Sequence, residues 1–181
     1  MRKKVLLLSM MIVLALPVFA GYFDVGITIG TNAHLGERNL DPSRLKLAWG
    51  AAIGLTDVWE LDVQANTQLV PTFVDTTSVS FLVQRALLGQ RSSGGQTAGV
   101  GINTLIGVGA MISPYTIDGR TTLTHLLVSL TPITVGSPVT GKRERLLAVT
   151  LAYNLQTKQV GVLFDLLKFD FYVVGSYKDY R

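Results

Sequence analysis

Apolar residues recur at every second position along most of this chain, and this period of two constrains its fold more than any other feature. Successive side chains of a β-strand point to opposite faces, so such spacing predicts strands with one apolar face. From position 23 the odd residues read Phe, Val, Ile, Ile, and the even residues read Asp, Gly, Thr, Gly. The clearest segments are 23–30, 45–54 and 59–66, and weaker ones are 79–84, 98–110, 125–130, 147–154 and 160–173.

The eighth segment carries an irregularity of its own. Its apolar residues occupy even positions up to 166 and odd positions from 169 onward. Such a change of parity requires one extra residue in the strand, so the sequence predicts a β-bulge near Leu166 and Leu167.

Residues 1–20 are predicted to be a signal peptide, which leaves 21–181 as a single domain. Three basic residues at positions 2–4 precede an apolar run over 5–16, and small residues stand before Gly21. That run is shorter than the about 20 residues that a spanning helix needs. Without the three basic residues the net charge falls from +4 to +1. A nucleic-acid partner therefore loses its main support, and we expect none.

Only 15% of the residues are charged although 48% are hydrophobic. Alternation alone does not decide whether the apolar faces meet a protein core or lipid. Three features favour lipid: the apolar faces are almost free of charge, the opposite faces are small and polar, and the segments approach the 9–11 residues of a tilted spanning strand. Because backbone groups in lipid must pair within the protein, we expect an all-β, antiparallel, up-and-down transmembrane barrel of about eight strands.

The polar faces then line the barrel interior. An eight-stranded barrel is too narrow for an open aqueous pore, so charges on these faces are expected to pair with one another. We interpret them as a structural plug in preference to a selectivity or proton site. The predicted interior polar residues are Asp24, Lys46, Glu60, Asp62, Gln64 and Asn66.

Aromatic residues cluster near the predicted strand ends, as in the aromatic girdles of membrane barrels. Ordinary core aromatics are the alternative interpretation. Arg85 has the parity of an apolar face, so we expect it to reach water from a strand end or the register there to slip. The predicted girdle residues are Tyr22, Trp49, Trp59, Tyr153, Phe171 and Tyr172.

The signal peptide, about eight amphipathic strands and the length of the remaining chain resemble the small outer-membrane β-barrel proteins of the OmpA, OmpX and OmpW kind. The resemblance implies both termini in the periplasm, insertion by the barrel-assembly machinery, and outer loops near 31–44, 70–77, 113–120 and 155–159. The inner connections 88–96 and 136–145 are longer than usual in that group, and the chain ends Tyr180-Arg181, where its members usually end on an aromatic residue.

The residues offer little catalytic chemistry. There is no cysteine, which excludes a thiolate metal site and a catalytic thiol. Some barrels of the resembled group are lipid A deacylases with His and Ser two residues apart on a lipid-facing strand, whereas His125 and Ser129 are four apart and predicted to face inward. The glycines at 99–109 continue a strand and open no helix, so they do not form a phosphate loop. The basic segment 142–145 is interpreted as a solvated turn.

We therefore expect a non-enzymatic outer-membrane barrel without cofactor or metal, with a structural, surface-interaction or porin-like role in the cell envelope. Its expected partners are outer-membrane lipid and a small apolar solute or an extracellular ligand. The OmpW type implies apolar solutes that leave sideways through the wall. The alternative is a soluble periplasmic β-barrel or sandwich whose apolar face points inward to bind an apolar ligand.

Overall fold

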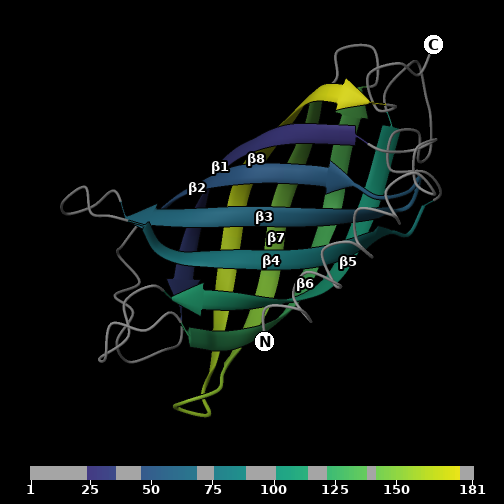
Figure 1. The fold of residues 1–181 in the computed structure, drawn as a ribbon. Coiled ribbons are helices and arrows are strands. Elements are labelled where there is room, and N and C mark those ends of the chain that lie inside the picture. Colours follow the sequence, from purple (N-terminus) through teal and green to yellow (C-terminus); the bar gives the residue numbers. More distant parts are fainter. Residues whose placement is uncertain are drawn as a thin grey trace, which may run out of the picture.

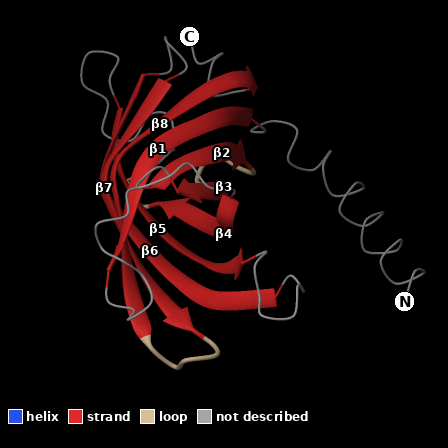
Figure 2. Ribbon diagram, turned by 90° about the vertical axis from the view of Figure 1, so that its left-hand side faces the viewer, coloured by secondary structure: helices blue, strands red, loops and turns tan. Residues whose placement is uncertain are grey.

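The computed structural model describes residues 24–35, 46–68, 76–88, 101–113, 122–137 and 142–175, and all regular structure in them is β-strand (Figure 2). No described residue belongs to a helix that is long and apolar enough to cross a membrane. The predicted signal peptide lies outside the described residues. The strands are β1 (Asp24–Leu35), β2 (Lys46–Gly54), β3 (Trp59–Gln68), β4 (Thr76–Ala86), β5 (Gly101–Ser113), β6 (Thr122–Ser137), β7 (Lys142–Asn154) and β8 (Val160–Gly175).

Each strand pairs with its neighbours in the chain, and β8 pairs with β1 to close the barrel (Figure 1). Every pairing is antiparallel. The predicted all-β, antiparallel, up-and-down barrel of eight strands is therefore confirmed. We call the end where β1 begins and β8 ends the proximal end, and the opposite end the distal end.

The strands are staggered around the barrel. A row of paired residues that starts at Asp24 of β1 and follows the registers through all eight strands returns to β1 at His34, ten residues further along. Such a stagger tilts the strands against the barrel axis. Eight strands leave an interior just wide enough for side chains to fill. The stagger and the strand number therefore explain why the interior can hold side chains from opposite walls in contact.

The strand ends agree with most of the predicted loops, with two differences. β1 continues to Leu35, five residues into the first predicted outer loop. β7 already begins at Lys142, so the interpretation of 142–145 as a solvated turn is wrong. The predicted inner connection 88–96 lies outside the described residues apart from Leu88.

The predicted bulge in β8 is confirmed, and β7 has a matching one. Leu166 and Leu167 both face outward, and the register with β1 skips Leu166. On β7 the neighbours Leu146 and Leu147 also both face outward, and Leu147 has a positive φ of 53°. These two bulges lie opposite each other, because Leu147 and Leu166 are the residues that the β7–β8 register passes over.

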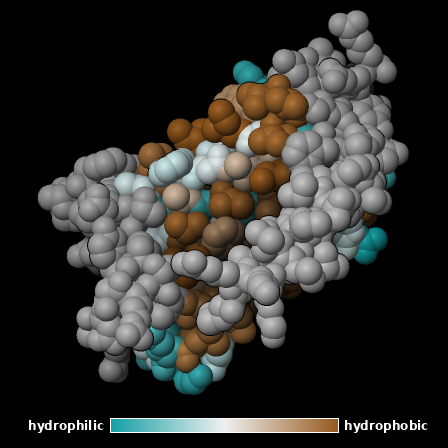
Figure 3. Space-filling view, in the orientation of Figure 1, coloured by the Kyte–Doolittle hydropathy of each residue, from teal (hydrophilic) through white to brown (hydrophobic). Residues whose placement is uncertain are grey.

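The barrel has a polar interior wall and an apolar outer wall. Figure 3 shows hydrophobic residues over most of the described surface that faces the viewer. Outward side chains such as Ile27, Val108 and Val128 are 52–61% exposed. Among the described strand residues, three charged side chains face outward, and all of them belong to the proximal parts of their strands: Arg85, Lys142 and Glu144. The rest of the described outer wall is free of charge.

Candidate functional site

Six charged side chains meet in the proximal half of the interior, and we call them the ion-pair network. Three are acidic and three are basic, and each is at most 2% exposed. Two come from β3, two from β7 and two from β8, so the network joins walls that lie far apart in the strand order. Its members are Glu60, Asp62, Arg143, Arg145, Lys168 and Asp170.

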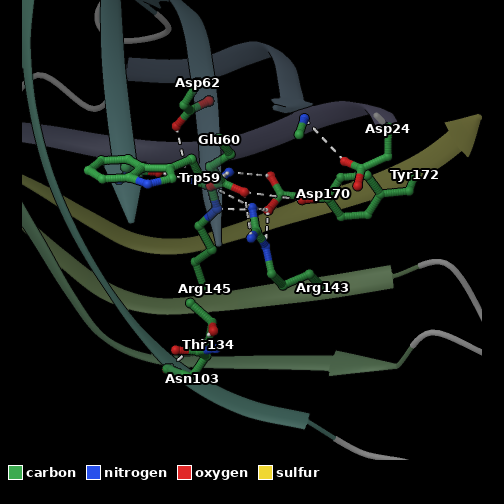
Figure 4. A network of polar contacts seen from close by, with 12 residues as sticks. Asp24, Trp59, Glu60, Asp62, Asn103, Thr134, Arg143, Arg145, Asp170 and Tyr172 are labelled. Carbon is green, nitrogen blue, oxygen red and sulfur yellow. Dashed lines mark hydrogen bonds and ion pairs between the residues drawn. The ribbon is translucent and has the colours of Figure 1, made fainter. Parts of the chain in front are cut away.

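Arg143 crosses the interior from β7 to β3. Its Nη1 and Nη2 donate to Oε2 and Oε1 of Glu60 at 2.7 and 2.9 Å. Its Nε donates to Oδ2 of Asp170 at 2.8 Å, and its guanidinium lies 5.5 Å from the ring centroid of Tyr172. The two parallel bonds to Glu60 form the bidentate geometry that suits a guanidinium and a carboxylate. Figure 4 shows this side chain pointing at both carboxylates.

Arg145 lies two residues further along β7 and points into the same centre. Its Nε donates to Oδ2 of Asp170 at 2.7 Å, and its Nη1 donates to Oδ2 of Asp62 at 2.9 Å and to Oε1 of Gln84 at 2.8 Å. Asp170 also accepts a bond of 2.6 Å from the Thr28 hydroxyl. Asp170 is therefore shared by two guanidinium groups and one hydroxyl.

Lys168 completes the network from β8. Its Nζ donates to Oδ2 of Asp62 and to Oε1 of Gln64. Gly30 on β1 makes room for it, because a Cβ at Gly30 would lie 2.9 Å from the Cα of Lys168. That distance is shorter than real Cβ contacts, so a larger residue would displace the backbone of β8.

Burial on this scale makes the network a plug. Taking charges out of water is costly, and only close pairing with further hydrogen bonds offsets that cost. Here every base has at least one carboxylate within 2.9 Å, and the members are 0–2% exposed. Charged side chains from β3, β7 and β8 therefore fill the interior at this level.

The structure places all six predicted interior residues inside the barrel. Glu60, Asp62 and Gln64 belong to the network or contact it. Asp24 accepts a bond of 3.1 Å from the Gly54 backbone N–H near the proximal end. Lys46, where β2 begins, is 8% exposed. Asn66 accepts from Gln64 at 2.9 Å and donates to Ser78 at 3.1 Å.

Sequence reasoning missed the basic half of the network. Arg143 and Arg145 were assigned to a turn, because the alternation of β7 was followed only back to Leu147, where the bulge reverses its parity. Lys168 and Asp170 were not singled out, although the parity after the bulge in β8 points them inward. The available signal was charge balance: three predicted interior acids with one lysine require buried bases.

The predicted aromatic girdle divides into an outer and an inner part. Trp49, Trp59, Tyr153 and Phe171 lie on the outer wall and are 37–48% exposed. The assignment of Tyr172 is wrong: it is 4% exposed, inside the barrel, with its hydroxyl 3.5 Å from Oε2 of Glu60. Tyr172 has the same parity as Lys168 and Asp170 of β8, so it faces inward with them. Tyr22 lies outside the described residues.

Arg85 adopts the strand-end position that its parity predicts. It faces outward one residue before β4 ends, and its guanidinium lies 5.7 Å from the ring centroid of its register partner Trp59. Lys142 stands in the same relation to Phe171, with its Nζ 5.7 Å from the ring centroid. Both pairs lie at the proximal edge of the apolar wall.

His125 and Ser129, which the sequence analysis compared with the His and Ser of lipid A deacylases, bond to other residues. The Nδ1 of His125 lies 2.9 Å from the hydroxyl of Thr124, and the Ser129 hydroxyl accepts a bond of 2.9 Å from Thr150. Among the described residues, no three His, Asp or Glu side chains come together in a way that could hold a metal ion. The side chain of His34 is not among those that the structure describes.

The geometry defines a closed eight-stranded up-and-down barrel with a charged plug. No family model, curated protein or solved structure matches this chain.

Proposed function

We propose that this chain is an integral outer-membrane β-barrel whose interior is closed by the ion-pair network. One observation carries the proposal: the described outer wall is apolar, and its charged side chains Arg85, Lys142 and Glu144 stay at the proximal edge. A wall of this kind in water would expose an apolar area far larger than soluble proteins tolerate. In lipid the same wall is matched to its surroundings, and the closed barrel pairs the backbone groups.

The proposed role is non-enzymatic: it supports membrane integrity or presents loops for surface interaction. Its partners are outer-membrane lipid, the barrel-assembly machinery during insertion, and an extracellular ligand. The expected signal peptide supports export to the cell outer membrane. A soluble periplasmic barrel that binds an apolar ligand receives less support, because it requires the apolar face inside, whereas Glu60, Arg143 and Asp170 occupy the interior.

The two tryptophans of the chain allow a direct test. Both lie on the outer wall, with Trp49 48% and Trp59 40% exposed. We expect phospholipids brominated along the acyl chain to quench the fluorescence of both, measured on Trp49→Phe and Trp59→Phe variants. We expect aqueous iodide to quench Trp49 weakly. Trp59 begins β3 beside Arg85, so shallow bromines should quench it more than deep ones.

Non-brominated vesicles and the same protein in urea serve as the controls for this measurement. Strong quenching of Trp49 by iodide, together with no response to brominated lipid, would contradict the membrane proposal. That outcome would favour the soluble alternative.

A second candidate function, sideways passage of small apolar solutes, is supported by an interruption of strand pairing. The β6–β7 register runs from Leu130 with Val149 to Ile133 with Leu146. It passes over residues 131 and 132 of β6 and residues 147 and 148 of β7, among them Pro132 and Leu147. Proline offers no backbone donor to a neighbouring strand. Together with the facing bulges of β7 and β8, this gap in the β6–β7 pairing forms a line of weak backbone pairing. The line crosses three adjacent strands of the apolar wall.

Planar-bilayer recordings separate these roles from an open pore. Because the plug fills the interior, we expect the wild-type barrel to carry no sustained ionic current, whichever of the two functions it has. Uptake of a small apolar solute into barrel-containing vesicles, without current, would favour sideways passage. A steady ohmic current from the wild type would contradict the closed interior.

A further inference from the structure

Two basic side chains of the outer wall each lie beside an aromatic ring of the neighbouring strand. They form the pairs Arg85 with Trp59 and Lys142 with Phe171, which we call the basic–aromatic pairs. Each base is the register partner of its ring and lies 5.7 Å from the ring centroid. Among the described residues, no carboxylate forms an ion pair with either base. Both bases therefore keep N–H donors for a group outside the chain.

The two basic–aromatic pairs lie on opposite sides of the barrel and at the same depth. Two strands separate them in either direction, β5 and β6 one way and β1 and β2 the other. The row of paired residues through Phe171 runs by way of β1 and β2 to Val63 on β3, four residues distal of Trp59. The stagger of ten residues over eight strands moves a row distally by nearly four residues over three strands. Trp59 is therefore level with Phe171 along the barrel axis.

The charges at this level favour an anion. The described outer wall carries two bases and one acid, and all three belong to the proximal edge. The acid, Glu144, lies two residues from Lys142 on the same face of β7 and offsets part of its charge. On the described parts of β3, β4 and β5, Arg85 is the only charged side chain that faces outward. The positive charge is therefore strongest beside Trp59.

We propose that the basic–aromatic pairs bind the phosphate groups of anionic phospholipids and so fix the depth of the proximal edge in the membrane. The inference rests on the proposed membrane function and names the lipid chemistry at this edge. A guanidinium or an ammonium group donates to phosphate oxygens, and aromatic rings of membrane barrels lie at the headgroup level. Because both pairs share one depth, a single layer of headgroups reaches both. Arg85 forms the stronger of the two sites, because no acid shares its strand face.

Competition between lipids at Trp59 tests the stronger site. The barrel is inserted into vesicles of phosphatidylcholine brominated along its acyl chains, which quenches tryptophan, and a non-brominated lipid is mixed in. In a Trp49→Phe variant, Trp59 is the one tryptophan of the chain. We expect phosphatidylglycerol to relieve its quenching about fivefold more effectively than non-brominated phosphatidylcholine, the attraction that one base near an anionic surface provides. Salt at about 1 M should reduce this preference, because it screens charges beyond about 3 Å.

Variants at both sites assign the preference to particular bases. Arg85→Gln removes the charge, and we expect it to make the two lipids equal at Trp59. The matched control Lys142→Gln removes a base at the same depth on the opposite side, and should leave the preference at Trp59 unchanged. Phe171→Trp, in a chain whose own tryptophans are replaced by phenylalanine, reports the second site. There we expect a smaller preference, which Lys142→Gln removes and Glu144→Gln increases.

Equal relief of quenching by the two lipids at Trp59, or a preference that persists in folded Arg85→Gln, would overturn the proposal. Heat-modifiable gel mobility verifies that each variant is folded. Quenching of Trp49 in a Trp59→Phe variant, measured in the same vesicles, reports membrane insertion separately. Quenching of both tryptophans without a lipid preference would refute the phosphate sites and leave the membrane proposal intact. The absence of quenching at either tryptophan would refute both.

Discussion

Replacing Arg143 with methionine is expected to lower the free energy of unfolding by about 3–5 kcal/mol, because it leaves a buried carboxylate without its partner. Glu60 is 0% exposed and accepts two short hydrogen bonds from Arg143, at 2.7 and 2.9 Å. Nη2 of Arg145 is further from Glu60, 3.4 Å from its Oε1. The measurement is equilibrium unfolding by urea of the barrel in lipid vesicles, followed by tryptophan fluorescence.

The double variant Glu60→Met with Arg143→Met should cost less than the sum of the two single variants, because neither charge is then left alone. Asp170 keeps Arg145 and Thr28 in that variant. Lys142→Met is the matched control: it removes a base from the same strand, but from the outer wall, and should cost less than about 1 kcal/mol. Equal losses for Arg143→Met and Lys142→Met would refute the plug.

The barrel itself could be predicted from the sequence, because the alternation of apolar and polar residues repeats in every strand. Each strand such as Val25–Ile29 or Leu61–Ala65 has one apolar and one polar face, and eight such segments without a helix admit few architectures. The direction of the faces followed as well: Glu60, Asp62 and Gln64 were predicted inside, and they are buried. Periodicity within one strand is a local property, so a single sequence contains it.

The pairing of charges could not be predicted in the same way, because it depends on the positions of the bulges in the strands. One extra residue at Leu147 exchanges the faces of β7, and Arg143 moves from an apparent turn into the interior. Tyr172 follows Lys168 and Asp170 on the inward face that β8 has after its bulge. In β8 the apolar residues before Leu166 and after Leu167 showed the change of parity, whereas in β7 the alternation was not followed before Leu147. Contacts across the barrel also join β3 to β7, which no local pattern connects.

An arginine at the centre of the outer wall gives the sharpest test of the membrane proposal. Val128 lies at the seventh position of the sixteen in β6 and faces outward, 52% exposed. In lipid, Val128→Arg should lower the unfolding free energy by about 2–4 kcal/mol, the cost of a guanidinium near the bilayer midplane. Leu123 faces outward to a similar extent, 48%, but is the second residue of the strand. Leu123→Arg should cost about 0–1 kcal/mol, because its guanidinium reaches the interface.

The comparison of these two variants separates lipid from water, because the substitutions are chemically identical and differ only in depth. A soluble barrel would hydrate the guanidinium at either position, and both variants would then stay within about 0.5 kcal/mol of the wild type. Urea titrations in vesicles measure the difference, and heat-modifiable gel mobility verifies that each barrel has closed. Depth dependence is the property that distinguishes the two surroundings, since exposure alone is nearly the same at Val128 and Leu123. Equal stability of both variants would contradict the membrane proposal. A loss of stability confined to Val128→Arg would support a bilayer around the apolar wall.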